Sequence, residues 1–151
     1  MSEKTLKLKK IFVYTLYNNL KNTPAKVYPT TEEVLETLKL LPKLKEPVQD
    51  YISLMLKVED VHKEYKPKLK GLSDEETKKV SKEKKEKLDK LNEEIIDYNS
   101  EHSADACEIK LDEATLKSLK AQFERNDWGK AWVVNIEEFG EILAALEEAC
   151  K

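Results

Sequence analysis

A strongly charged segment over residues 74–99 constrains the fold more than any other part of the chain. Its few apolar residues recur at helical spacing and form one narrow stripe, which predicts a continuous helix. At a rise of about 1.5 Å per residue, this helix would be roughly 40 Å long. The stripe consists of Val80, Leu88, Leu91, Ile95 and Tyr98.

A second helix is predicted immediately before this segment. Pro47 suits its first turn, and we expect the helix to continue to Lys66, before Pro67. Large side chains recur in it at alternating steps of four and three residues, as in a coiled coil. These are Tyr51, Met55, Val58, His62 and Tyr65. Because only a short turn around Gly71 joins the two helices, the sequence predicts a long antiparallel hairpin over residues 47–99.

Shorter elements flank the hairpin. Residues 5–10 alternate apolar and basic side chains and predict a short edge strand. Residues 107–111 alternate apolar and charged side chains and predict a second strand. We expect these two strands to pair, because a single strand cannot satisfy its backbone hydrogen bonds. Further helices are expected over residues 11–21, after Thr30, after Asp112 and after Asn135.

The helix after Thr30 begins with a capping box, because Glu33 follows Thr30 at the required spacing. We expect this helix to be brief and to stop at Pro42. Its apolar residues are Val34, Leu35, Leu38 and Leu41. Two further capping signatures are Ser73 with Glu76 and Asn135 with Glu138. The elements together predict a mainly α (α+β) fold, with the hairpin, shorter flanking helices and a minor two-stranded sheet in one domain over residues 1–151.

Charge and composition limit the classes of partner that the chain can bind. The net charge is -3, from 27 basic and 30 acidic residues, and Arg125 is the only arginine. A sequence-specific nucleic-acid reader normally uses several arginines, so this balance disfavours nucleic acid as a partner. No run approaches the roughly 18–20 apolar residues that cross a membrane. Cys107 and Cys150 are the only cysteines, which favours free thiols in a reducing cytoplasm.

The sequence predicts no catalytic residue, no metal site and no cofactor. Around Gly129 the chain resembles a calcium-binding loop, but the twelfth position holds Asn135 where a bidentate glutamate is needed. Cys107 lies near His102, yet a structural zinc site needs four Cys or His ligands that this chain is not expected to bring together. Cys107 is interpreted as a small buried hydrophobic residue, although sequence leaves a Cys–His couple open.

The one candidate binding site is predicted around Trp128 and Lys130. Trp128 and Trp132 are the only tryptophans, and Trp128 falls in a loop expected over residues 125–130. Tryptophan is enriched in protein interfaces because one side chain supplies a large apolar area and a hydrogen-bond donor. We expect Trp128 to be the more exposed of the two. The preferred interpretation, however, is that both rings fold back and close the end of the core.

The order of elements resembles an uncharacterised family of short proteins encoded by phages and prophages of Gram-positive bacteria. The similarity lies in the lysine-rich N-terminal strand, the charged hairpin, residues 107–119 and the C-terminal segment 136–148. The stretch from Trp128 to Trp132 departs from it. The resemblance implies no established activity.

The expected function is therefore a non-enzymatic interaction protein that binds a protein of host or viral origin in the host cell cytoplasm. One version is an inhibitor of a host defence system, such as an anti-CRISPR protein. Another version is a virion or tail-morphogenesis accessory protein. The rival interpretations are a nucleic-acid-binding protein and an enzyme whose site carries no recognisable motif.

Overall fold

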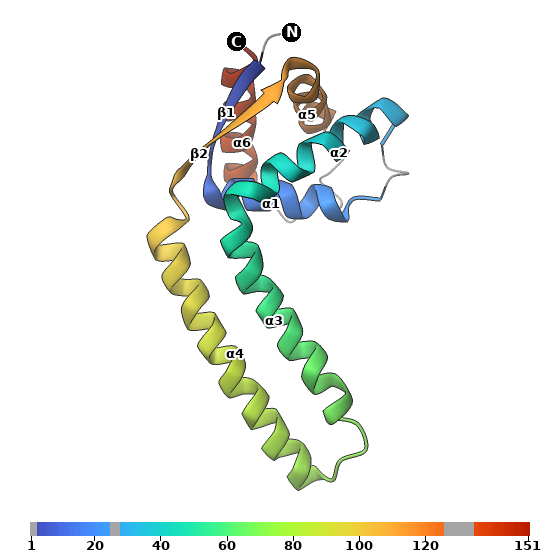
Figure 1. Cartoon of the computed structure of the whole chain (residues 1–151), viewed down its shortest axis with the longest axis vertical. Coiled ribbons are helices and arrows are strands. Elements are labelled where there is room, and N and C mark those ends of the chain that lie inside the picture. Colours follow the sequence, from blue (N-terminus) through green and yellow to red (C-terminus); the bar gives the residue numbers. More distant parts are fainter. Residues whose placement is uncertain (1–2, 25–27, 126–134) are drawn as a thin grey trace. The chain divides into compact units, whose positions relative to one another are not determined.

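A computed structural model describes residues 3–24, 28–125 and 135–151 (Figure 1). The chain divides into two compact units, of which the first combines residues 1–48 with residues 104–151. The second unit comprises residues 49–103 and is the helical hairpin. The predicted mainly α fold, with its hairpin and small sheet, is confirmed. The prediction of a single domain stays a prediction.

The first unit is built on a two-stranded antiparallel sheet. Strand β1 spans Glu3–Lys9 and strand β2 spans Ala106–Asp112, with Leu6 opposite Ile109. Alternate side chains of each strand point to opposite faces, so one face carries the buried apolar residues and the other is exposed. The pairing that the sequence predicted is therefore confirmed. Strand β1 begins two residues earlier and ends one residue earlier than predicted, and β2 extends one residue beyond each predicted end.

Helices cover the buried face of the sheet and complete the first core. Helix α1 spans Lys10–Asn22, α2 spans Thr31–Lys45 and a short 3-10 turn, η2, spans Glu46–Val48. Helix α5 spans Glu113–Arg125 and α6 spans Ile136–Cys150. The core is formed by side chains from both strands and all four α-helices, including Leu6, Leu16, Leu40, Leu111, Leu116, Phe123 and Ile142.

One order of elements occurs twice in the first unit. The order β1, α1, α2 recurs as β2, α5, α6, and matching elements have equal lengths of 7, 13 and 15 residues. Both strands have the same alternation of buried and exposed residues. Buried positions of the first helices also correspond, with Leu16 matching Leu119 and Leu20 matching Phe123. The hairpin thus lies in the sequence between two β-α-α segments.

All three predicted helix caps form. The hydroxyl of Thr30 accepts a hydrogen bond from the Glu33 amide at 3.2 Å, and Ser73 and Asn135 cap α4 and α6 in the same way. The predicted stop at Pro42 is wrong, because α2 continues to Lys45. Proline cannot donate to the carbonyl four residues back, on Leu38, but both residues are exposed, so solvent can satisfy that carbonyl.

The second unit consists of α3, Gln49–Lys68, and α4, Asp74–His102. Gly71 adopts a φ of 71° in the connecting turn, a left-handed conformation that glycine accepts without strain. Most apolar seam residues are only half-buried, and Tyr65 is the side chain that α3 and α4 bury fully. His62, predicted on the seam, is exposed, and the half-buried Val61 lies beside it in the sequence.

Candidate interaction surface

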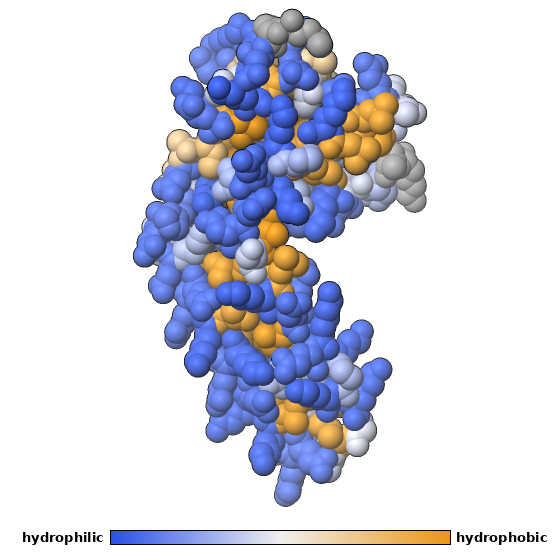
Figure 2. Space-filling view, in the orientation of Figure 1, coloured by the Kyte–Doolittle hydropathy of each residue, from blue (hydrophilic) through white to orange (hydrophobic). Residues whose placement is uncertain are grey.

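Helix α2 presents apolar side chains to solvent. Leu35 and Leu38 are 54% and 57% exposed, and Pro42, one turn further on, is exposed as well. Their spacing of three and four residues places them along one side of the helix, here called the α2 outer face. Val34 and Leu41 beside them are half-buried. Figure 2 shows a hydrophobic patch at this place, over α2.

The opposite side of α2 buries a different set of residues. Thr37, Leu40 and Leu44 are buried there, although the sequence pointed to the apolar set that contains Leu35 and Leu38. Both sets follow helical spacing, so the contact with the rest of the fold decides which one is buried. In the N-terminal half of α2 this choice turns polar side chains inward and leucines outward.

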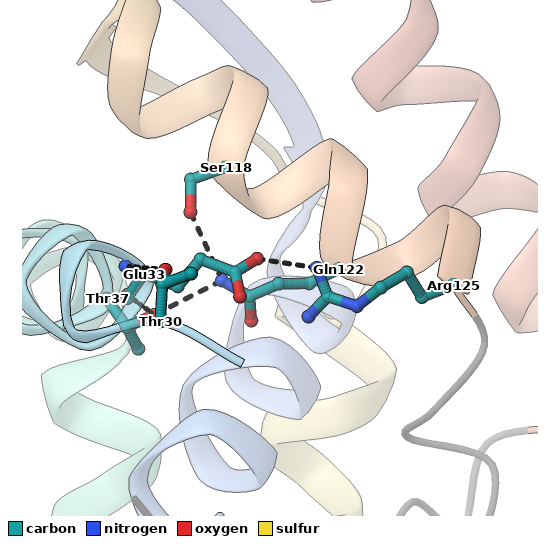
Figure 3. A network of polar contacts seen from close by, with 6 residues as sticks. All are labelled: Thr30, Glu33, Thr37, Ser118, Gln122 and Arg125. Carbon is teal, nitrogen blue, oxygen red and sulfur yellow. Dashed lines mark hydrogen bonds and ion pairs between the residues drawn. The ribbon is translucent and has the colours of Figure 1, made fainter. Parts of the chain in front are cut away.

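Polar side chains join this inward side of α2 to α5 (Figure 3). Arg125 Nη1 donates to Glu33 Oε1 at 2.6 Å, and the Glu33 side chain is only 13% exposed. The amide nitrogen of Gln122, which is 2% exposed, lies 3.3 Å from the hydroxyls of both Thr37 and Ser118. The contact between the two helices therefore depends on directional hydrogen bonds in addition to apolar packing.

A second polar contact lies one turn along the same helix. The hydroxyl of Thr115 donates to Glu36 Oε2 at 2.6 Å, while Lys39 lies 3.3 Å from the other carboxylate oxygen. Hydrogen bonding from Thr115, followed by the effect of Lys39, outweighs partial desolvation and lowers the pKa of Glu36 below its ordinary value. Burial raises the pKa of the nearby Tyr28 phenol. Neither shift moves the pKa of its group toward neutral pH.

The polar contact between α2 and α5 lowers the stability of the fold. Glu33 Oε2 and Gln122 Oε1 are buried, and neither has a hydrogen-bond partner among the described residues. A buried unsatisfied polar atom typically costs about 1–3 kcal/mol. An apolar inner face with polar side chains outside would be the ordinary arrangement for such a helix. The inverted arrangement keeps two leucines available at the surface, which is typical of a functional surface.

The histidines and cysteines considered for chemistry belong to four different elements. His62 is exposed on α3, His102 lies at the end of α4, and Cys107 and Cys150 are half-buried on β2 and α6. Within residues 3–24, 28–125 and 135–151, no group of three or more His, Cys, Asp or Glu side chains is placed to hold a metal ion. Among the same residues, every helix is too short or too polar to cross a membrane.

The predicted binding residues Trp128 and Lys130 lie outside the described residues, as does Trp132. The structure instead indicates Leu35 and Leu38, which sequence reasoning assigned to the apolar set of α2 without distinguishing its two sides. One signal was present in the sequence: leucines also occur at 40 and 44, which is more than one buried stripe on a short helix requires.

Comparison with known proteins adds no relative. The chain matches no family model, no curated protein and no solved structure.

Proposed function

We propose that this chain is a non-enzymatic interaction protein that binds a protein partner on the α2 outer face. The supporting observation is the orientation of α2, which buries polar residues against α5 and leaves Leu35 and Leu38 more than half exposed. Exposed leucines of this kind are covered when an apolar surface of another protein packs on them. The adjoining exposed charges are of both signs, namely Glu32, Lys39 and Lys45, so the face carries no strong bias toward an anionic ligand such as nucleic acid.

The resemblance to phage proteins narrows this proposal. The partner is then a host or viral protein, encountered in the cytoplasm of the infected cell. Binding to a host defence protein would make the chain an inhibitor of the anti-CRISPR kind. Binding to a phage structural protein would make it a virion or tail-morphogenesis accessory. Both functions use the same type of surface, and the identity of the captured partner distinguishes them.

The first prediction tests the α2 outer face. Affinity-tagged chain, incubated with nuclease-treated lysate of phage-infected Gram-positive cells, is expected to retain a partner in stoichiometric amount. The double substitution Leu35→Ser and Leu38→Ser should reduce capture at least tenfold, because it removes the exposed apolar contact. Its melting temperature should change little, since both side chains are exposed in the free protein.

Lys39→Ser is the matched control, because it changes an exposed residue of the same helix without altering the leucines. It should leave capture within about twofold of the parent chain. Equal capture by the parent and the double leucine variant would contradict the proposal. Capture from an untreated lysate that is lost from the nuclease-treated one would instead favour the nucleic-acid-binding alternative.

A further inference from the structure

One edge of the sheet in the first unit is open to pairing. In an antiparallel ladder, residue pairs alternate between those that exchange hydrogen bonds and those whose backbone groups point outward. The Lys10 amide donates to the Asp105 carbonyl at 2.8 Å, which places this pair in the bonded set. Following the register in steps of two along β2, Cys107, Ile109 and Leu111 bond to β1. The backbone groups of Glu108 and Lys110 therefore point away from β1.

A separate contact confirms this direction. Lys43 Nζ, from α2, donates to the carbonyl oxygen of Lys110 at 3.1 Å, so that carbonyl faces α2 and not β1. The amides of Glu108 and Lys110 have no hydrogen-bond partner within the part of the chain that the structure describes. Two outward donors and the Glu108 carbonyl are thus available at one edge. Their spacing along the strand, about 6.6 Å, equals one repeat of a paired strand.

A groove runs beside this edge. It has a volume of about 420 Å³ and is lined by Lys43, Glu46, Pro47, Glu108, Ile109 and Lys110. One wall is the edge of β2, and the other is the end of α2 with η2. Charges of both signs line it, so its charge selects neither anions nor cations. What the groove offers most specifically is a row of backbone hydrogen-bonding groups.

We propose that β2 binds an extended peptide segment of a partner protein as a third strand, seated in this groove. The peptide's carbonyls would accept from the amides of Glu108 and Lys110, and one of its amides would donate to the Glu108 carbonyl. Backbone pairing of this kind supplies affinity, while alternate side chains of the peptide contact Pro47 and supply preference. The site uses none of the α2 outer face, so it does not depend on the function proposed above.

Lys43 regulates the strength of this pairing. Its ammonium group donates a hydrogen bond to the Lys110 carbonyl. That carbonyl is the next acceptor that an added strand would use. Lysines beside free sheet edges commonly limit unwanted strand addition. Removing Lys43 should therefore strengthen peptide binding. If the groove instead attracted peptides through the positive charge of Lys43, the same substitution would weaken it.

The test uses the full chain and linear peptides selected from a random decapeptide display library. Selected peptides are expected to bind the parent chain and to lose at least tenfold in affinity for Lys110→Pro, which removes one outward amide. Proline is tolerated at edge-strand positions whose amide faces outward, so the fold should persist. Lys110→Ala is the control, because it alters the side chain but keeps the amide, and its affinity should stay within about twofold.

Two further measurements make the test independent of the proline variant. Lys43→Ala should raise peptide affinity severalfold, and methylating alternate backbone nitrogens of the peptide should abolish binding while the intervening ones are tolerated. The proposal is overturned if no peptide is selected, if Lys110→Pro binds as well as Lys110→Ala, or if Lys43→Ala weakens binding. Loss of binding in the Leu35→Ser and Leu38→Ser variant would also overturn it, by assigning the peptides to α2.

Discussion

Tyr65 holds the two helices of the hairpin together more than any other side chain. It is fully buried, and its hydroxyl donates to Glu83 Oε1 on α4 at 2.8 Å. The ammonium groups of Lys68 and Lys87 lie 4.9 and 5.0 Å from its ring centroid. Glu64 pairs with both lysines, at 3.1 and 3.4 Å. One aromatic ring thus organises contacts from both helices near the turn of the hairpin.

Truncating this residue should destabilise the hairpin strongly. Tyr65→Ala should cost about 3–5 kcal/mol in its unfolding, because a large cavity replaces the ring. Tyr65→Phe keeps the ring and loses only the hydrogen bond, so about 1 kcal/mol is expected. Hydrogen exchange of the α3 and α4 amides measures both changes. Equal losses for the two variants would show that the ring packs less tightly than its burial indicates.

The contact between Thr115 and Glu36 makes stability depend on pH. The pKa of Glu36 is lowered in the folded chain, chiefly by the Thr115 hydroxyl. A carboxyl with a lowered folded-state pKa stabilises the fold above its unfolded pKa, near 4.3, and loses that contribution as the pH falls through the folded value. Its ionised form is therefore the stabilising one at neutral pH.

Replacing Thr115 with valine should lower the free energy of unfolding by about 1 kcal/mol at pH 7. The difference from the parent chain should narrow as the pH falls from the ordinary glutamate pKa, near 4.3, toward the lowered folded-state pKa of Glu36. Urea denaturation at pH 7 and pH 3 measures this, and Thr115→Ser, which keeps the hydroxyl, is the control. If the difference in unfolding free energy between Thr115→Val and the parent chain is the same at both pH values, the lost stability comes from packing and not from the hydrogen bond to Glu36.

At the scale of single elements, local signals in the sequence predicted most of what is observed. Caps at Thr30, Ser73 and Asn135 form as expected, because capping depends on residues three apart in sequence. The paired strands also follow from local alternation.

The orientation of α2 could not be predicted in this way. Its leucines at 35 and 38 and those at 40 and 44 each follow helical spacing, so periodicity alone selects neither side. The choice depends on Gln122 and Arg125 of α5, which are distant in sequence and meet Thr37 and Glu33 only in the folded chain. The α2 outer face was hidden for this reason. Predictions for Trp128 and Lys130, which lie outside the described residues, stay predictions.

At the scale of the whole molecule, the hairpin lies in the sequence between two β-α-α segments that share one core. Among the described residues, the buried hydrophobic side chains lie outside residues 49–103, with the exception of Tyr65. Within the hairpin, the rings of Tyr51 and Tyr98 are 5.4 Å apart, so the start of α3 and the last turns of α4 lie close together. A short linker can therefore replace the hairpin without stretching the chain.

Replacing residues 49–103 with a short Gly/Ser linker should leave a first unit that unfolds cooperatively. It should also keep both proposed binding surfaces, because the α2 outer face and the β2 edge belong to that unit. The excised hairpin should be only partly helical, since it buries a single side chain fully and helices gain little stability alone. Circular dichroism melts of the two fragments measure this. A linker variant without a cooperative transition would mean that the hairpin contributes to the core of the first unit. An excised hairpin with full helicity would mean that its half-buried seam is sufficient to stabilise the two helices.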